Sequence, residues 1–226
     1  MATVILVRHG RTAANVNGIL AGWTPGVTLD ETGREQAEGL AKRLAGVTLD
    51  AIITSPLERA RETAAPLLAE RPRTPLHVDE RVGECRYGDW SGRPLKELSR
   101  EPLWKVVQGQ ASGAIFPEGE SMVAMQARAV EAVRHWNAEL GDRAVYVVVS
   151  HGDVIKAILA DALGMHLDQF QRIVVDPASV SVVSYSAVRP FVIRTNDTGG
   201  SLAFLSRSRK RRRSSDAAVG GGAGDA

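Results

Sequence analysis

The sequence has very little cysteine. Cys85 is the only cysteine in 226 residues, so the chain cannot form an internal disulfide bond. The start of the chain has no charged segment followed by an apolar signal segment, and no apolar run approaches the length that spans a bilayer. We therefore expect a cytoplasmic protein that does not enter a membrane. No strand, turn and helix pattern frames Cys85, which argues against a catalytic thiol.

Metal-binding patterns and aromatic residues are also scarce. No cluster of Asp, Glu and His has the spacing of a metal site, so we expect no metal and no cofactor. Aromatic residues make up 5% of the chain, and no basic segment is interleaved with them as in many surfaces that bind nucleic acid.

An excess of positive charge is found only at the end of the chain. Residues 199–226 hold six Lys and Arg against two Asp, a net charge of +4, and are otherwise rich in Gly, Ser and Ala. Since the whole chain carries +2, residues 1–198 carry −2. We expect a folded domain over residues 1–198 and a disordered basic tail. The cluster from Arg207 to Arg213 leaves open a non-enzymatic function in nucleic-acid binding, against which the acidic folded part argues.

An apolar segment near the start, residues 4–7, ends abruptly in charged side chains. Its four branched aliphatic residues predict a strand buried on both faces, as in the middle of a parallel sheet. Arg8, His9 and Arg11 follow it, and ligands of open α/β sheets bind at the carboxyl ends of the strands. Guanidinium groups can hold an anion there, and a neutral imidazole can attack it.

The same pattern occurs a second time. Residues 146–149 predict another buried strand, followed by Ser150-His151-Gly152 and an apolar-periodic helix over residues 154–163. If the two strands are neighbours in one sheet, His9 and His151 lie side by side, each at the start of a helix whose amides favour an anion. The content of 44% hydrophobic residues is enough for the core of one α/β domain.

Other segments predict the rest of the sheet. Short strands are expected over residues 50–55 and 76–78. Residues 181–185 and 191–194 predict an antiparallel pair of edge strands, which could pair across a homodimer.

Three more helices are expected. A capping box at residues 32–35 begins a helix that ends at Leu44. A second helix begins at Ser55-Pro56 and carries Arg59 toward the carboxyl ends of the strands. The third helix covers residues 122–140. Its predicted core face consists of Val123, Ala127, Val130, Val133 and Leu140.

A loop with several glycines, residues 84–92, offers a carboxylate for proton transfer. Glu84 is the best placed of its acidic residues, and Glu80 and Asp89 remain alternatives.

Together these motifs resemble the histidine phosphatase superfamily, which includes metal-independent phosphatases and 2,3-bisphosphoglycerate-dependent phosphoglycerate mutases. The resemblance implies a three-layer α/β/α sandwich with a central, mostly parallel sheet, a phosphoglycerate mutase-like fold and a phosphohistidine intermediate. It spans about residues 3–195, with the motifs in the order of the family. The motifs are Arg8-His9-Gly10-Arg11 with Asn15, residues 55–64, Glu84 with Tyr87-Gly88, and Ser150-His151-Gly152.

The chemistry of these side chains agrees with a phosphomonoesterase. A neutral His9 would attack phosphorus, and Glu84 would protonate the leaving oxygen and later activate water. The phosphoryl oxygens of a small phosphorylated substrate would be held by the remaining candidates, which are Arg8, Asn15, Arg59 and His151. Cationic side chains then take the part that a magnesium ion plays elsewhere.

A short insertion favours hydrolysis over phosphoryl transfer. Mutases of the family are similar in their first loop to residues 20–23, but they carry a long insertion with paired arginines after the acid residue. Here the cap insertion covers only about residues 85–120, and water can reach a phosphoenzyme under a small cap. We therefore expect a phosphatase, with a phosphoglycerate mutase as the alternative. Ser91 stands where many relatives have glutamate, which concerns only the cap.

The cap also carries basic side chains. They could contact an acidic substrate, or they could simply face solvent, and the sequence leaves both readings open. These residues are Arg93, Lys96, Arg100 and Lys105.

Overall fold

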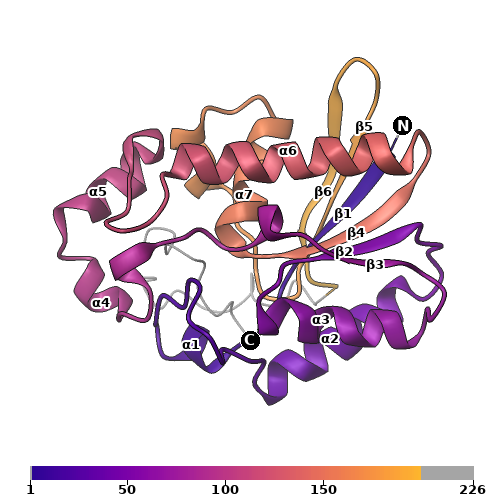
Figure 1. The fold of residues 1–226 in the computed structure, drawn as a ribbon, viewed down its shortest axis with the longest axis horizontal. Coiled ribbons are helices and arrows are strands. Elements are labelled where there is room, and N and C mark those ends of the chain that lie inside the picture. Colours follow the sequence, from indigo (N-terminus) through magenta and orange to yellow (C-terminus); the bar gives the residue numbers. More distant parts are fainter. Residues whose placement is uncertain (1, 200–226) are drawn as a thin grey trace, which may run out of the picture.

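The computed structural model describes residues 2–199, and the predicted basic tail, except for its first residue Gly199, lies outside the described residues. A six-stranded sheet lies between two layers of helices (Figure 1). This arrangement confirms the three-layer α/β/α sandwich. No helix in the described part of the chain has the length and apolar character needed to cross a membrane.

The centre of the sheet is formed by the two strands that precede the His-Gly pairs. β1 (Ala2–Arg8) pairs in parallel with β4 (Val145–Ser150). β2 (Ala51–Thr54) and β3 (Leu76–Val78) extend the parallel part beyond β4. On the other side of β1, β5 and β6 run antiparallel, and the strand order is β3-β2-β4-β1-β5-β6.

The predicted antiparallel pair is present, but only one of its strands is an edge. β5 (Val180–Tyr185) lies between β1 and β6, whereas β6 (Pro190–Asp197) is the outer strand. The prediction of two edge strands was therefore wrong for β5. Its side chains at Val180 and Val183 are buried in the core because β1 pairs with it along its full length.

Alternation along the central strands divides the core between the two helical layers. Val4 and Leu6 of β1 pack on the side of α6 (Met122–Leu140) and α7 (Gly152–Ala162). Ile5 and Val7 pack on the side of α2 (Glu31–Leu44) and α3 (Glu58–Ala69). Successive side chains of a strand point to opposite faces, so this short apolar run serves both cores. Full burial of one such side chain contributes about 1.5–3 kcal/mol.

The cap and the connections contain short helices and helical turns. They are α1 (Ala13–Val16), α4 (Leu95–Leu98), α5 (Pro102–Gly109), η1 (Glu80–Val82), η2 (Gly88–Trp90), η3 (Ala111–Gly113) and η4 (Leu167–Arg172).

The start of α2 lies two residues before the predicted capping box. Asp30, not Thr32, is the cap, because its carboxylate accepts a hydrogen bond from the amide of Gly33 at 2.7 Å. The hydroxyl of Thr32 instead accepts a hydrogen bond from the guanidinium group of Arg11 at 2.8 Å. The predicted end at Leu44 is confirmed.

The start of α3 lies two residues later than predicted, since Pro56 was expected at the first helical position. The helix begins at Glu58, and Ser55 and Pro56 lie in the turn before it. The hydroxyl of Ser55 accepts a hydrogen bond from the amide of Leu57 at 3.2 Å. This turn leaves the serine at the end of β2, where its side chain contacts His151 rather than capping a helix.

The long helix has the predicted bounds but a shifted core face. Val123 and Ala127 are exposed, contrary to the prediction, because the buried face of the helix runs from Met122 through Met125 to Trp136. The residues of α6 that are buried are Met122, Met125, Ala129, Val130, Ala132, Val133 and Trp136.

Candidate active site

The carboxyl ends of β1 and β4 bring the two predicted histidines together. Arg8 is opposite Ser150 in the parallel register, so the next residue of each strand is a histidine. The ring centroids of His9 and His151 are 5.2 Å apart. The prediction that they lie side by side is therefore confirmed, but His9 is not at the start of a helix: α1 begins four residues later, with Thr12 as its cap.

The imidazole of His9 is held in one tautomer by its own loop. Its Nδ1 lies 2.7 Å from the carbonyl oxygen of Gly10, which can only accept, so Nδ1 carries the hydrogen and Nε2 keeps its lone pair. Burial lowers the pKa of His9 well below its usual value, and the positive charges of Arg59 and Arg8 lower it further. The ring is therefore neutral near pH 7.

His151 caps the N-terminus of α7 and lies against Ser55. Its Nε2 is 2.7 Å from the hydroxyl oxygen of Ser55. Burial, together with the charges of Arg59 and Arg8 and the neighbouring His9, holds the pKa of His151 well below its usual value. The first amides of α7 and two guanidinium groups thus surround a pair of neutral imidazoles, an environment that attracts an anion.

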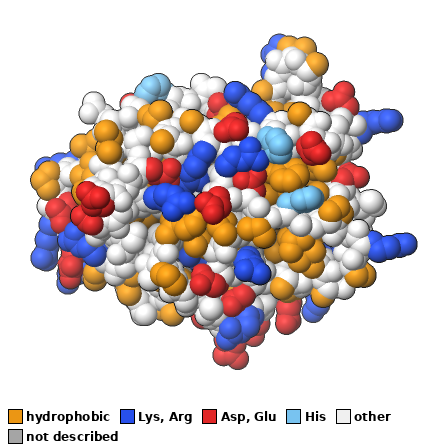
Figure 2. Space-filling model, viewed as in Figure 1, with side chains coloured by type: hydrophobic (Ala, Val, Ile, Leu, Met, Phe, Trp, Pro, Cys, Tyr) orange, Lys and Arg blue, Asp and Glu red, His pale blue; other side chains and the backbone are white. Residues whose placement is uncertain are grey.

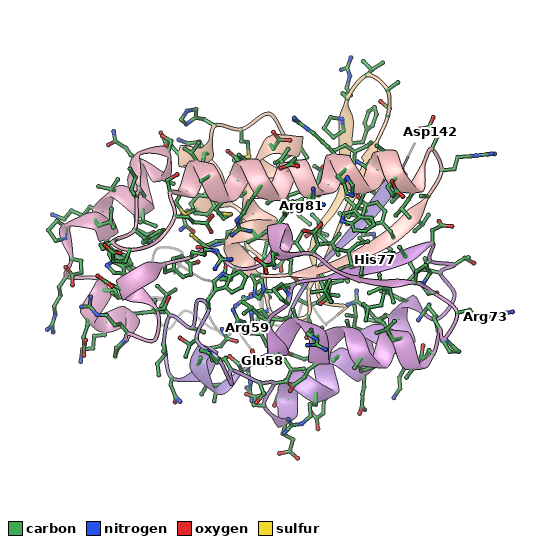
Figure 3. The ribbon with its side chains drawn as sticks, in the orientation of Figure 1. Glu58, Arg59, Arg73, His77, Arg81 and Asp142 are labelled. Atoms are coloured by element: carbon green, nitrogen blue, oxygen red, sulfur yellow. The ribbon has the colours of Figure 1, made fainter. Side chains whose placement is uncertain are left out.

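Two buried arginines flank the histidines. Arg8 donates from Nη1 to the carbonyl oxygen of Val175 at 2.8 Å, and Arg59 donates from Nη2 to that of Gly22 at 2.9 Å. Arg59 is only 1% exposed, whereas Arg61, two residues later on α3, is exposed. Figure 3 shows Arg59 near the middle of the molecule. Backbone carbonyl groups therefore fix the orientation of both guanidinium groups. Arg59 lines the pocket that His9 and Glu84 also line, whereas Arg8 and His151 are not among the residues that line it.

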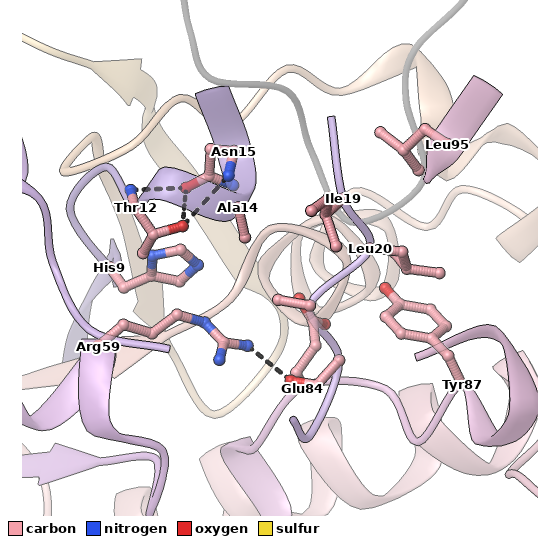
Figure 4. Close-up of a pocket in the computed structure, with 12 residues that line it drawn as sticks. His9, Thr12, Ala14, Asn15, Ile19, Leu20, Arg59, Glu84, Tyr87 and Leu95 are labelled. Carbon is pink, nitrogen blue, oxygen red and sulfur yellow. Dashed lines mark hydrogen bonds between the residues drawn. The ribbon is translucent and has the colours of Figure 1, made fainter. Parts of the chain in front are cut away.

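Asn15 lines the same pocket and completes the capping box of α1 with Thr12. Its side-chain oxygen accepts hydrogen bonds from the amide and the hydroxyl of Thr12, at 3.0 and 2.9 Å (Figure 4). Its amide NH2 group is not used in these bonds.

The structure distinguishes among the three candidate acids. Glu80 and Asp89 are exposed, whereas Glu84 is 3% exposed and lines the pocket with His9. Burial raises the pKa of Glu84 to about 7, and the negative charge of Asp153 adds to this effect. Glu84 Oε1 accepts a hydrogen bond from the amide of Cys85 at 2.9 Å. Cys85 itself is fully buried, and burial raises the pKa of its thiol well above the usual value.

Comparison with known proteins gives the same assignment as the motifs. A family model, the histidine phosphatase superfamily (branch 1), matches residues 4–198. This chain belongs to the histidine phosphatase superfamily. It is 32% identical over 183 residues to the adenosylcobalamin/alpha-ribazole phosphatase of Escherichia coli, which covers 79% of this chain and 87% of that protein.

Two further relatives extend the comparison. Phosphoserine phosphatase 1 of Hydrogenobacter thermophilus is 32% identical, with 88% of this chain and 93% of that protein covered. The solved structure of Bacillus stearothermophilus YhfR has a TM-score of 0.79 and 32% identity over 87% of this chain and 98% of that chain. Phosphatases of small metabolites are among the similar proteins, and so are phosphoglycerate mutases.

The walls of the site in this histidine phosphatase include residues that sequence reasoning missed. The sequence left open whether the basic cap residues contact a substrate, but Leu95 is the only residue between 93 and 116 that lines the pocket. The loop after β1 supplies more of the wall, because its backbone pairs with the cap: Leu20 donates to Arg93 and Gly92 donates to Leu20. The wall residues from this loop are Ala14, Ile19, Leu20, Ala21 and Gly22.

A buried polar group lies behind Glu84 and was also missed. Tyr87 donates its hydroxyl hydrogen to Asp153 at 2.8 Å, and the ammonium group of Lys156 is 3.7 Å from the same carboxylate. Lys156 also donates to Gln171 at 2.9 Å. The sequence signals were the presence of Tyr87 in the motif after Glu84 and the position of Asp153 and Lys156 in the first turns of the helix after His151.

Proposed function

We propose that this histidine phosphatase is a metal-independent phosphomonoesterase with His9 as nucleophile and Glu84 as proton donor. The observation that carries the proposal is the pairing of a neutral imidazole, whose Nε2 is free of the Gly10 bond, with a buried carboxyl group whose pKa is about 7. Both line the same pocket as Arg59. At neutral pH the base has its lone pair and the acid retains a proton in a large fraction of molecules.

The first half-reaction transfers the phosphoryl group to the enzyme. The lone pair of His9 Nε2 forms a bond to phosphorus, and the bond to the ester oxygen breaks. The electron pair stays on that oxygen, which takes the proton of Glu84 and leaves as the alcohol. Arg8, Arg59, His151 and the amide NH2 of Asn15 donate to the phosphoryl oxygens as charge is redistributed among them.

The second half-reaction returns the enzyme to its starting state. The Glu84 carboxylate accepts a proton from water, the water oxygen attacks phosphorus, and the bond to Nε2 breaks with its electrons returning to the ring. Inorganic phosphate leaves, and Glu84 is protonated again. No metal and no cofactor takes part in either step.

The test is phosphate release from a panel of phosphomonoesters in the presence of EDTA, with detection of phosphohistidine in acid-free quenched samples. His9→Ala should abolish both turnover and the phosphoenzyme, and His151→Ala should lower kcat by about a hundredfold or more. Substantial turnover by His9→Ala, or loss of activity in EDTA, would overturn the proposal.

Phosphoglycerate mutase activity is the second candidate, because mutases are among the relatives. The short cap supports hydrolysis instead, since it leaves water free to reach the phosphoenzyme. The two activities separate when phosphoenzyme is formed in the presence of 3-phosphoglycerate. Release of inorganic phosphate without formation of bisphosphoglycerate would support the phosphatase.

The proposal extends to the partners and the location of the protein. A small phosphorylated metabolite is the substrate, the protein is cytoplasmic, and nucleic acid is not a partner. On the face of the molecule shown in Figure 2, basic and acidic side chains are intermixed, which supports the absence of a nucleic-acid partner.

A homodimer through β6 is supported by the exposed apolar side chains of Phe191 and Ile193 on this outer strand. Sedimentation of the purified protein tests the dimer.

A further inference from the structure

The pocket is polar at one end and apolar at the other. His9, Asn15 and Arg59 lie on one side of it, and Ile19, Leu20, Leu95 and Tyr87 lie on the other (Figure 4). Arg59 is the only Lys or Arg among the lining residues, and the proposed mechanism already uses it for the phosphoryl group. The alcohol part of a substrate must extend from the phosphoryl site along the apolar side.

Two basic residues that are near pocket residues in the sequence have side chains that pair with carboxylates elsewhere. Arg11 donates to Asp30 at 2.8 Å, on the α2 side of the loop. The guanidinium group of Arg93 is 2.8 Å from a carboxylate oxygen of Glu101. None of these side chains lines the pocket.

Arg86 lies in the loop that carries Glu84, and its side chain is also engaged elsewhere. Its guanidinium group lies 3.9 Å from the centre of the Trp23 ring and 3.3 Å from the carboxylate of Glu80. Of the other basic cap residues, Lys96, Arg100 and Lys105 are exposed and do not line the pocket. In the described part of the chain, no Lys or Arg other than Arg59 lines the pocket, so its wall holds no second cation for another negative group on the substrate.

A carboxylate on the alcohol would be unfavourable in this wall. It would lose its hydration against Ile19, Leu20 and Leu95 without gaining an ion pair. It would also lie in the same pocket as the carboxyl group of Glu84. An alkyl group at the same place would instead bury its own apolar surface and that of the wall residues.

We propose, on the basis of the phosphatase function above, that the preferred substrates are phosphomonoesters of uncharged alcohols with an apolar group next to the ester. Phosphomonoesters with a carboxylate close to the ester are poor substrates. Leu95 and Ile19 determine this specificity, because they form the wall on the cap side and on the loop side.

The test compares kcat/KM for n-butyl phosphate, glycerol 3-phosphate and 3-phosphoglycerate, with p-nitrophenyl phosphate as the reference. Glycerol 3-phosphate and 3-phosphoglycerate differ in charge at the end of the alcohol, so their ratio isolates the carboxylate. We expect kcat/KM to fall in the order given, with butyl phosphate at least about tenfold better than 3-phosphoglycerate. A value for 3-phosphoglycerate equal to or above that for butyl phosphate would overturn the inference while leaving the phosphatase intact. Failure to hydrolyse any substrate, including p-nitrophenyl phosphate, would overturn both.

Variants of the wall give a second, independent measurement. Leu95→Arg places a cation on the cap side of the apolar wall, and Ile19→Arg places one on the loop side. Both positions are partly exposed in the native protein. Each should raise the kcat/KM ratio of 3-phosphoglycerate to butyl phosphate by about tenfold. Lys96→Ala, an exposed position on the same short helix as Leu95, is the matched control and should leave the ratio unchanged. An unchanged ratio in both arginine variants would contradict the assignment of this wall.

Discussion

At the scale of single residues, one buried environment shifts the pKa values of two groups in opposite directions. Burial favours the neutral form of each, so it lowers the pKa of His9 and raises that of Glu84 to about 7. The positive charges of Arg59 and Arg8 lower the pKa of His9 further and oppose the rise in the pKa of the carboxyl group. The negative charge of Asp153 adds to that rise. The site therefore keeps a nucleophile and an acid in their working forms at the same pH.

The dependence of the rate on the leaving group tests whether Glu84 donates a proton in the reaction. Glu84→Gln should strongly slow hydrolysis of alkyl phosphates, whose alkoxides need a proton, by about a hundredfold or more. The loss should be smaller for p-nitrophenyl phosphate in the first step, because its phenolate leaves without a proton. Phosphohistidine should then accumulate, since water is no longer activated.

Steady-state rates and quenched samples with both substrates give this comparison. Asp89→Asn is the matched control, because Asp89 is exposed on the same loop. Equal losses on both substrates, with no accumulated phosphoenzyme, would remove Glu84 from the acid role.

The pH dependence follows from the same two groups. For an alkyl phosphate, kcat/KM should fall as the pH rises above about 7, because free Glu84 then loses the proton that it must donate. His9 must be neutral, and its lowered pKa keeps it so to well below pH 6.5. The acidic side of the profile should therefore show no loss from His9 near pH 6. Profiles for n-butyl and p-nitrophenyl phosphate measure this, and a strong alkaline decline with both would contradict the acid assignment.

At the scale of elements, the loop that carries His9 is held against α2 by glycine. A Cβ atom at Gly33 would overlap the carbonyl oxygen of Arg11, and one at Gly10 would lie 2.6 Å from the carbonyl oxygen of Gly33. Two backbone segments approach each other here more closely than any side chain allows. The position of the nucleophile therefore depends on a helix that contributes no side chain to the pocket.

Gly33→Ala should lower the free energy of unfolding by about 1–3 kcal/mol and reduce kcat, because the loop must move away from the helix. Gly39→Ala on the same helix is the control. Its Cβ would meet nothing within 4 Å, so the higher helix propensity of alanine should stabilise the protein by about 0.5–1 kcal/mol. Urea unfolding and steady-state kinetics of both variants test this, and equal effects would show that the close approach is unimportant.

At the scale of the whole molecule, the predicted basic tail should be dispensable. Deletion of residues 199–226 should leave the melting temperature and kcat/KM unchanged within error, since the segment has only a few apolar residues with which to bury surface. Binding to nucleic acid, if it occurs, should disappear with the tail and weaken steeply with salt. A large fall in melting temperature or turnover would contradict the prediction.

The sequence by itself determined the elements whose signals are local. Continuous aliphatic runs ending in His-Gly predicted β1 and β4 because strands buried on both faces need apolar side chains at every position. The predicted bounds of α6, residues 122–140, are confirmed, and the ends are local features: the Ser121 hydroxyl accepts a hydrogen bond from the amide of Ala124, and Gly141 follows the helix. Placement of His9, Arg59 and His151 followed from a single rule, that parallel strands present their carboxyl ends at one edge.

Only the tertiary structure decided which carboxylate is buried and what the substrate meets. Glu84 and Asp89 stand on the same loop, and local sequence does not say which of them turns inward. The wall formed by Ile19 and Leu95 joins segments far apart in the chain through backbone hydrogen bonds that have no side-chain signature. The same is true of the Tyr87–Asp153 contact behind the acid. Burial, pKa and pocket shape depend on which distant segments pack together, and a local pattern does not contain that information.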